Sequence, residues 1–240
     1  MTLMPATRPN SASAPACSSL GAKMLDMLVS PDDVFDQVLA APPCLLNWLL
    51  PTLLVALTSL FLLRTANDET ASVPGPSQAL ESQSPIVNST AAQAKPGSAD
   101  WQRVSALATC TGAFAGTFWS AFLLWFIGRA FLRTRFSYMK AVEVVALTGS
   151  IVVLGAIVTA LLIGASGNPA ARPALSFFAP RLPPDDPVRL VLDILNFFHL
   201  WTTTVLALGL SRLSGVTFKE SAFWVFGYWL VARLALILLA

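Results

Sequence analysis

The sequence has few charged residues, so functions that depend on a charged surface are poorly supported. Only 12% of its 240 residues are Asp, Glu, Lys or Arg, whereas 55% are hydrophobic. Average soluble domains carry roughly 25% charged residues. The net charge of +2 is too small to indicate binding to nucleic acid. This composition predicts a multi-pass membrane protein in place of soluble domains.

Residues that support metal, redox or catalytic chemistry are also scarce. The cysteines, Cys17, Cys44 and Cys110, are widely spaced without a CxxC pair, and His199 is the single histidine. We therefore expect no disulfide framework, no metal site and no cofactor. The sequence also lacks a P-loop, a GxGxxG turn, an HExxH helix, a GxSxG elbow and paired catalytic carboxylates. We predict that the protein is not an enzyme.

The chain does contain long uncharged apolar runs. About 20 apolar residues cross the hydrocarbon core of a bilayer as one helix, and helices satisfy every backbone amide within the segment. We predict an all-α bundle of five transmembrane helices that occupies residues 44–240. The predicted spans are residues 45–63, 104–127, 144–165, 188–213 and 221–240, with a polar outer loop at 65–100.

The segment before the first span has the pattern of an amphipathic helix. Residues 1–19 are rich in Ser, Ala and Pro and predict a disordered tail. Within residues 20–43, Ser30 is placed to cap a helix that has Pro31 at its first position. Its aspartates share one face, and its other face is formed by Val34, Phe35, Val38 and Leu39. We predict that this helix lies at the cytosolic membrane surface, docked against the protein's own loops near their arginines.

Positive charge predicts the orientation of the bundle. The densest basic cluster lies between spans two and three and consists of Arg129, Arg133, Arg135 and Lys140. Positively charged loops remain in the cytosol, so this loop and the N-terminus are both predicted to be cytosolic. The Ala- and Pro-rich termini and the short tail favour a bacterial cytoplasmic membrane.

The stretch "LSRLSGVTFKESAFW" predicts a tight turn between the last two spans. Gly215 is suited to end a helix in the left-handed conformation. Thr217 and Glu220 have the spacing of a capping box before the next apolar run. Spans four and five are therefore predicted to form an antiparallel hairpin.

One stretch, "LVSPDDVFDQVLAAP", lies before span one, and another, "LNFFHLWTTTVLALGLSRLSGVTFKESA", lies around span four. Together they resemble the Ypt-interacting-protein (YIP) family, in particular its bacterial branch. The matching marks are Ser-Pro followed by Val34-Phe35, then Leu200-Trp201, and Gly209 leading to Gly215 and Lys219. The resemblance implies five membrane helices with a cytosolic N-terminus. Eukaryotic members associate with Rab-type GTPases and with one another, whereas the bacterial branch implies no specific function.

Asp193 and Arg233 are the charged residues expected to lie inside the bilayer, where charge is costly and often functional. Asp193 and Arg233 lie at nearly equal distances from the turn, so we predict that they approach each other as an ion pair. The alternatives are that both reach outer water, or that they serve transport. Asn196, His199 and Thr203 follow Asp193 on one arc of span four. We favour a polar seam between helices over a proton or ion path.

Glycine spacing and one acidic residue predict helix contacts. Gly112 and Gly116 form a GxxxG motif, for which we favour packing within the chain over a dimer contact, with Gly149 and Gly155 as partners. Glu143 begins span three, where the helix dipole favours an acid; pairing with Arg129, Arg133 or the N-terminal helix remains open.

The sequence as a whole predicts a non-catalytic scaffold or partner-binding membrane protein. Its expected partners are membrane lipid and another membrane protein or a second copy of the chain. The alternative is a small transporter or channel component that uses the polar residues of spans four and five. A membrane enzyme acting on lipid is a third, weaker alternative.

Overall fold

The computed structural model describes residues 19–72, 99–167, 171–178, 188, 191–192 and 195–239. Within these ranges the named elements are all helices, which confirms the predicted all-α class. They are α1 (Leu20–Val29), α2 (Pro31–Ala40), α3 (Leu45–Ser72), α4 (Ala99–Ala130), α5 (Tyr138–Ser166), the 3₁₀ helix η3 (Leu175–Phe178), α7 (Phe197–Ser214) and α8 (Phe218–Leu239).

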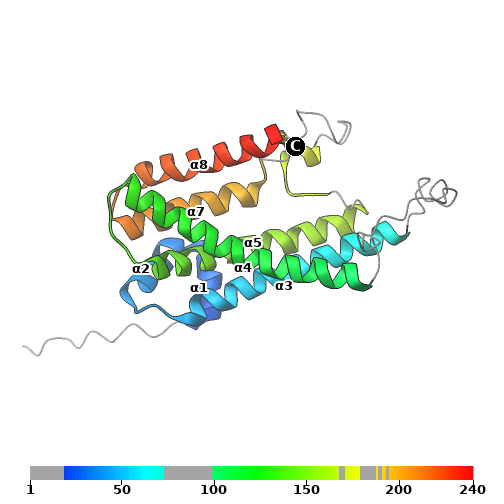
Figure 1. The fold of residues 1–240 in the computed structure, drawn as a ribbon, viewed down its shortest axis with the longest axis horizontal. Coiled ribbons are helices and arrows are strands. Elements are labelled where there is room, and N and C mark those ends of the chain that lie inside the picture. The colour runs from blue at the N-terminus through cyan, green and yellow to red at the C-terminus, as the bar shows by residue number, and fades with distance from the viewer. Residues whose placement is uncertain are drawn as a thin grey trace, which may run out of the picture.

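The long helices run alongside one another, and the two short N-terminal helices cover one end of the bundle (Figure 1). We call this end the α2 end; it also holds residues 131–137 and the turn at Gly215. The opposite end, where α8 finishes, is the C-terminal end. Helix α5 is central and contacts α1, α2, α3, α4 and α7, whereas α8 packs chiefly on α7.

Within the described residues, three helices are long and apolar enough to cross a membrane. The segments are Leu45–Thr65, Gln102–Ala130 and Tyr138–Ser166. They match the first three predicted spans. On α3, exposed apolar side chains recur every three or four residues, at Leu46, Leu50, Leu53, Leu57 and Phe61. This spacing gives one apolar helix face directed away from the bundle, as expected of a membrane protein whose surroundings are lipid.

The membrane helices are longer than the sequence predicted. Helix α3 continues to Ser72 and α4 begins at Ala99, so both extend into residues 65–100, which were predicted as a loop. Once a helix is nucleated, each added residue gains a backbone hydrogen bond at little cost, so polar residues alone do not end it. Residues 73–98 lie outside the described ranges.

The fourth long helix begins later than predicted. Helix α7 starts at Phe197, whereas the predicted span began at residue 188. The side chain of Asn196 accepts a hydrogen bond from the Phe198 amide and caps the helix. Asn196 also forms an isolated bridge with Ala174, and the Phe197 amide donates to the Pro173 carbonyl. These bonds hold the start of α7 against the segment that carries η3.

The predicted N-terminal helical region is two helices joined at Ser30. Ser19 caps α1, because its hydroxyl accepts a hydrogen bond from the Ala22 amide. Pro31 takes the first position of α2 as expected. The hydroxyl of Ser30 makes no capping bond, contrary to the prediction; the Ser30 amide instead donates to the Asp26 carbonyl and continues the end of α1.

Candidate functional site

Helix α2 docks on the bundle through its apolar face. Val34, Phe35 and Val38 are fully buried, in one cluster with side chains of α5 and α7. A Cβ atom built at Gly209 of α7 would lie 2.5 Å from Val144 Cγ1 of α5 and 3.2 Å from Phe35 Cζ. Gly209 therefore permits the close approach of three helices. Each fully buried apolar side chain here contributes about 1.5–3 kcal/mol.

The acidic face of α2 is held by one arginine of α7. Arg212 Nη2 lies 2.9 Å from Asp32 Oδ1, and Arg212 Nη1 lies 3.5 Å from Asp36 Oδ1. The Arg212 Nε atom also donates to Asp32 at 2.9 Å. These side chains are exposed, so the pairs orient α2 more than they stabilise it. Helix α2 thus docks on helices α5 and α7 and not on loops as predicted, but its acidic face does lie beside an arginine as predicted.

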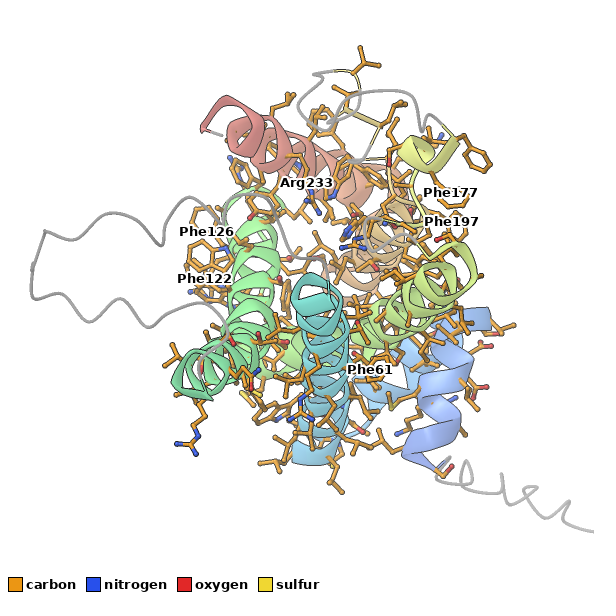
Figure 2. The ribbon with its side chains drawn as sticks, turned by 90° about the vertical axis from the view of Figure 1, so that its right-hand side faces the viewer. Phe61, Phe122, Phe126, Phe177, Phe197 and Arg233 are labelled. Carbon is orange, nitrogen blue, oxygen red and sulfur yellow. The ribbon has the colours of Figure 1, made fainter. Side chains whose placement is uncertain are left out.

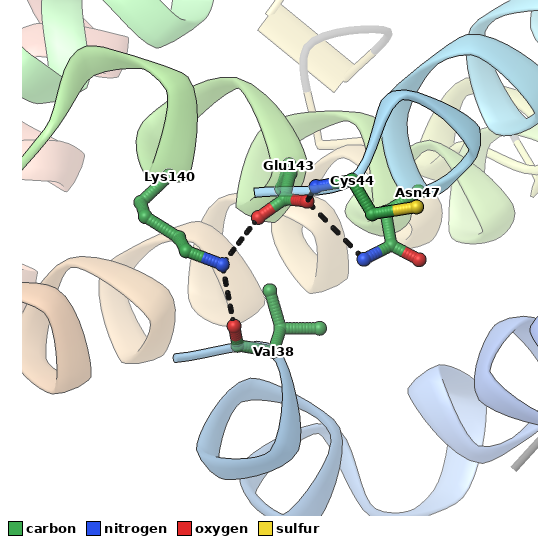
Figure 3. Close-up of polar contacts among 5 residues, drawn as sticks. All are labelled: Val38, Cys44, Asn47, Lys140 and Glu143. Atoms are coloured by element: carbon green, nitrogen blue, oxygen red, sulfur yellow. Dashed lines mark hydrogen bonds and ion pairs between the residues drawn. The ribbon is translucent and has the colours of Figure 1, made fainter. Parts of the chain in front are cut away.

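A buried ion pair between Lys140 and Glu143 fixes the segment that joins α2 to α3 (Figure 3). Lys140 Nζ lies 2.8 Å from Glu143 Oε2 and donates to the Val38 carbonyl at 2.7 Å. Glu143 Oε1 accepts hydrogen bonds from the Cys44 amide and, at 3.2 Å, from Asn47 Nδ2. We call these five residues the Glu143 cluster. It bonds the last turn of α2 and the first turn of α3 to α5.

The charged groups of the Glu143 cluster are buried, so each of them must be paired. The Glu143 side chain is fully buried, and that of Lys140 is 11% exposed. Removing charged groups from water is costly unless each charge is paired and its remaining lone pairs and protons are bonded. Here both carboxylate oxygens and the ammonium have partners. The arrangement therefore specifies one geometry for the α2–α3 junction.

The sequence prediction missed the role of Glu143. It was interpreted as an acid favoured by the helix dipole, with Arg129, Arg133 or the N-terminal helix as open partners. Its partner is Lys140, three residues earlier in α5, together with the start of α3. Two features of the sequence could have indicated this role. Lys140 and Glu143 form an acid–base pair spaced i, i+3 at the start of one apolar run, and Asn47 is a polar residue at the start of another apolar run.

Of the four cations predicted to form an exposed basic loop, three are exposed and one is buried. Arg129, Arg133 and Arg135 are exposed at the α2 end, and Arg129 lies 5.4 Å from the ring centroid of Trp125. Lys140 is not part of this exposed surface, because its side chain is buried against Glu143. The correction follows from helix geometry: α5 begins at Tyr138, which turns Lys140 inward.

The turn between α7 and α8 has the predicted geometry. Gly215 adopts the left-handed conformation with φ +67°. The Thr217 amide donates to Glu220 Oε2 at 3.3 Å, and the Glu220 amide donates to Thr217 Oγ1 at 3.4 Å. The predicted capping box and antiparallel hairpin are both confirmed.

The residues predicted as a polar seam have local roles. The Asn196 side chain caps α7, and Thr203 Oγ1 donates to the His199 carbonyl at 2.8 Å. Neither side-chain bond crosses to another helix. His199 is exposed at the surface of α7 and lines two cavities, one shared with α3 and α5 and the other with α4 and α8.

The predicted Asp193–Arg233 ion pair stays a prediction, because Asp193 lies outside the described residues. Arg233 is half-buried on α8 and lines the cavity that α8 shares with α4 and α7.

Gly149 and Gly155, predicted as packing partners of the GxxxG motif, pack against other helices instead. Cβ atoms built there would lie 3.1 Å from Val55 Cγ2 of α3 and 2.9 Å from Phe198 Cγ of α7. Gly112 and Gly116 have no described neighbour within 4 Å of such an atom. The GxxxG motif therefore does not bring α4 against another described helix of the chain. A contact with a second copy remains a prediction.

Together, the long apolar helices, their exposed apolar faces and the docked N-terminal helices define a helical membrane protein. Comparison with protein families identifies it further, since residues 25–240 match the Yip1 domain. The chain therefore belongs to the Yip1 domain family, and the predicted YIP membership is confirmed. No curated protein and no solved structure matches the chain.

Proposed function

We propose that this protein is a five-span membrane scaffold that binds a partner protein through its α2 end. Helices α7 and α8 would supply the fourth and fifth spans. At 18 and 22 residues they measure about 27 Å and about 33 Å, close to the hydrocarbon thickness of roughly 30 Å. Exposed Phe223, Leu230 and Val231 on α8 support contact with lipid.

Positive charge supports placing the α2 end in the cytosol. Exposed cations at this end are Arg129, Arg133, Arg135, Arg212 and Lys219. The exposed cations described near the C-terminal end are Arg64, Arg103 and Arg172, and Arg233 is half-buried toward that end. The denser cluster favours the cytosolic side. We place the protein in a bacterial cytoplasmic membrane with a cytosolic N-terminus.

The observation that carries the binding role is the Glu143 cluster. It holds α2 and the start of α3 in one fixed arrangement, so the surface that α1 presents beside them is preorganised for binding. On that surface Leu25 is 68% exposed and Val29 is 84% exposed, one helical turn apart. Two large apolar side chains at an end of the bundle that also carries exposed arginines suit a partner with an apolar contact surface and an acidic rim.

Photo-crosslinking in native membranes tests this role. A photoreactive residue at Arg135 should give one dominant adduct with another polypeptide. The double variant Leu25→Glu/Val29→Glu should remove that adduct, because two carboxylates would replace the apolar contact. The matched control is Phe178→Glu, which changes an exposed apolar residue at the C-terminal end and should leave the adduct unchanged.

The same experiment has a clear negative outcome. An adduct that survives the Leu25→Glu/Val29→Glu change would show that this surface does not carry the binding. Adducts formed only with a second copy of the chain would replace the partner-binding role with self-association.

A further inference from the structure

A cavity of about 190 Å³ lies between α4, α7 and α8. It exists because α4 packs chiefly on α3 and α5, whereas α8 packs on α7. The two groups of helices therefore meet loosely along this line. The cavity is separate from the Glu143 cluster and from the surface on which the proposed function rests.

The lining of this cavity changes from apolar to polar along the bundle axis. Helices α4 and α7 run toward the α2 end, and α8 runs away from it (Figure 1). The part nearer the α2 end is lined by Leu124, Ile127, Leu206 and Val225, and the part nearer the C-terminal end by His199, Thr202, Tyr228 and Arg233. The cavity thus has an apolar part and a hydrogen-bonding part, in line with each other.

Arg233 is the charged group at the polar part. Figure 2 shows Arg233 on the side of α8 that faces the bundle, whereas Phe122 and Phe126 of α4 point away from it. Among the described residues, none forms a hydrogen bond or an ion pair with Arg233. A guanidinium carries five donors and stays protonated, so its natural complement is a carboxylate or a phosphate.

We infer that this cavity binds an anionic amphiphile, with its acyl chain between Leu124 and Leu206 and its anionic group on Arg233. A single inorganic anion would use Arg233 but not the apolar part of the cavity. A neutral lipid would fill the apolar part and leave the guanidinium without an acceptor. Only a molecule with both parts matches the whole lining, and the headgroup is a phosphate or a carboxylate.

Native mass spectrometry of the full-length protein in neutral detergent tests this inference. The probes are dioleoylphosphatidylglycerol, oleate, the uncharged dioleoylglycerol and inorganic phosphate. At least one anionic amphiphile should bind about tenfold more tightly than dioleoylglycerol, as expected for a charge-assisted hydrogen bond. Binding of phosphatidylglycerol alone identifies a phosphate headgroup, and equal binding of oleate extends the site to carboxylates. Equal binding by dioleoylglycerol or by inorganic phosphate would overturn the inference.

Two variants separate the two parts of the site. Arg233→Gln should weaken anionic amphiphile binding about tenfold. Leu123→Phe should weaken it by filling the apolar part of the cavity, without any change of charge. The matched control is Arg64→Gln, which removes an exposed positive charge toward the C-terminal end. Arg64 lines neither this cavity nor the one that α7 shares with α3 and α5. An equal loss in Arg64→Gln would reveal a general charge effect and refute the site.

The alternative role for Arg233 is the ion pair with Asp193 predicted from the sequence. If Arg233 serves only that pair, Asp193→Asn and Arg233→Gln will lower the melting temperature equally and neither will change lipid binding. If the site binds an anionic amphiphile, Asp193→Asn will retain or strengthen lipid binding while Arg233→Gln loses it.

Discussion

Glu143 joins two parts of the chain that are distant in sequence, the start of α5 and the start of α3. Its oxygens accept bonds from Lys140, from the Cys44 amide and from Asn47. A fully buried carboxylate is tolerated only when all these bonds are present, so the cluster acts as a unit. At the residue scale, the fixed position of the N-terminal helices therefore depends on one acid.

Replacing Glu143 should destabilise the protein strongly. Glu143→Gln keeps the size of the side chain but leaves the Lys140 ammonium buried without its counter-charge. Breaking a buried pair in this way costs about 3–5 kcal/mol. The expected result is a clear fall in the unfolding midpoint of the purified protein in detergent. Glu220→Gln is the matched control, because that carboxylate is exposed in the turn. A double variant, Lys140→Met/Glu143→Gln, should lose less than the sum of the two single changes.

Arg212 provides the contrasting case of an exposed pair. Its side chain is 41% exposed, and those of Asp32 and Asp36 are 49% and 57% exposed. Water and salt screen such pairs, so Arg212→Gln should lower the unfolding midpoint only slightly at low salt. At high salt the variant and the unchanged protein should unfold together. A large, salt-independent loss would mean that Arg212 holds α2 by packing instead of by charge.

At the scale of helices, Gly209 controls how closely α5, α7 and α2 pack. Gly209→Ala would place a Cβ atom 2.5 Å from Val144 Cγ1, so the Val144 side chain or a helix must shift. Overpacking costs about 1–3 kcal/mol, more than the roughly 0.5–1 kcal/mol gained from a better helix former. The unfolding midpoint should therefore fall. Gly227→Ala is the matched control, since nothing lies within 4 Å of its Cβ position, and it should be neutral or stabilising.

A compensating change makes this prediction specific. Val144→Ala removes the methyl group that meets the new Cβ atom and should restore part of the stability of Gly209→Ala. If the double variant is less stable than either single variant, the close contact at Gly209 is not the cause.

The elements that the sequence predicted correctly are those with a local signal. The apolar runs of α3, α4 and α5 exceed the length of a bilayer crossing, and Gly215 with Thr217 and Glu220 forms a turn that needs no distant partner. The amphipathic pattern of α2 also identified its buried face. These features follow from spacing within a few residues.

The features that the sequence did not predict depend on contacts between distant segments. Lys140 looked like a loop cation, and only the approach of Val38 and Asn47 makes it part of a buried cluster. The start of α7 was misplaced because the bridge between Ala174 and Asn196 has no signal in either segment alone. Gly112 and Gly116 matched a common motif that says nothing about which surface lies opposite.

At the scale of the whole molecule, the order of the helices places alternate connections at opposite ends. Residues 131–137 and the turn at Gly215 share the α2 end with α1 and α2, whereas η3 lies toward the C-terminal end (Figure 1). Five spans with the proposed orientation therefore require Arg135 in the cytosol and Phe178 outside.

Cysteine labelling in intact cells tests this topology directly. In a chain whose Cys17, Cys44 and Cys110 are replaced by Ser, Phe178→Cys should react with a membrane-impermeant maleimide added outside, because Phe178 is 81% exposed. Arg135→Cys, also at an exposed position, should react only after the membrane is permeabilised. The reverse pattern would invert the orientation. Labelling of both positions from outside would leave an even number of crossings between them, which would remove α5 as a complete span.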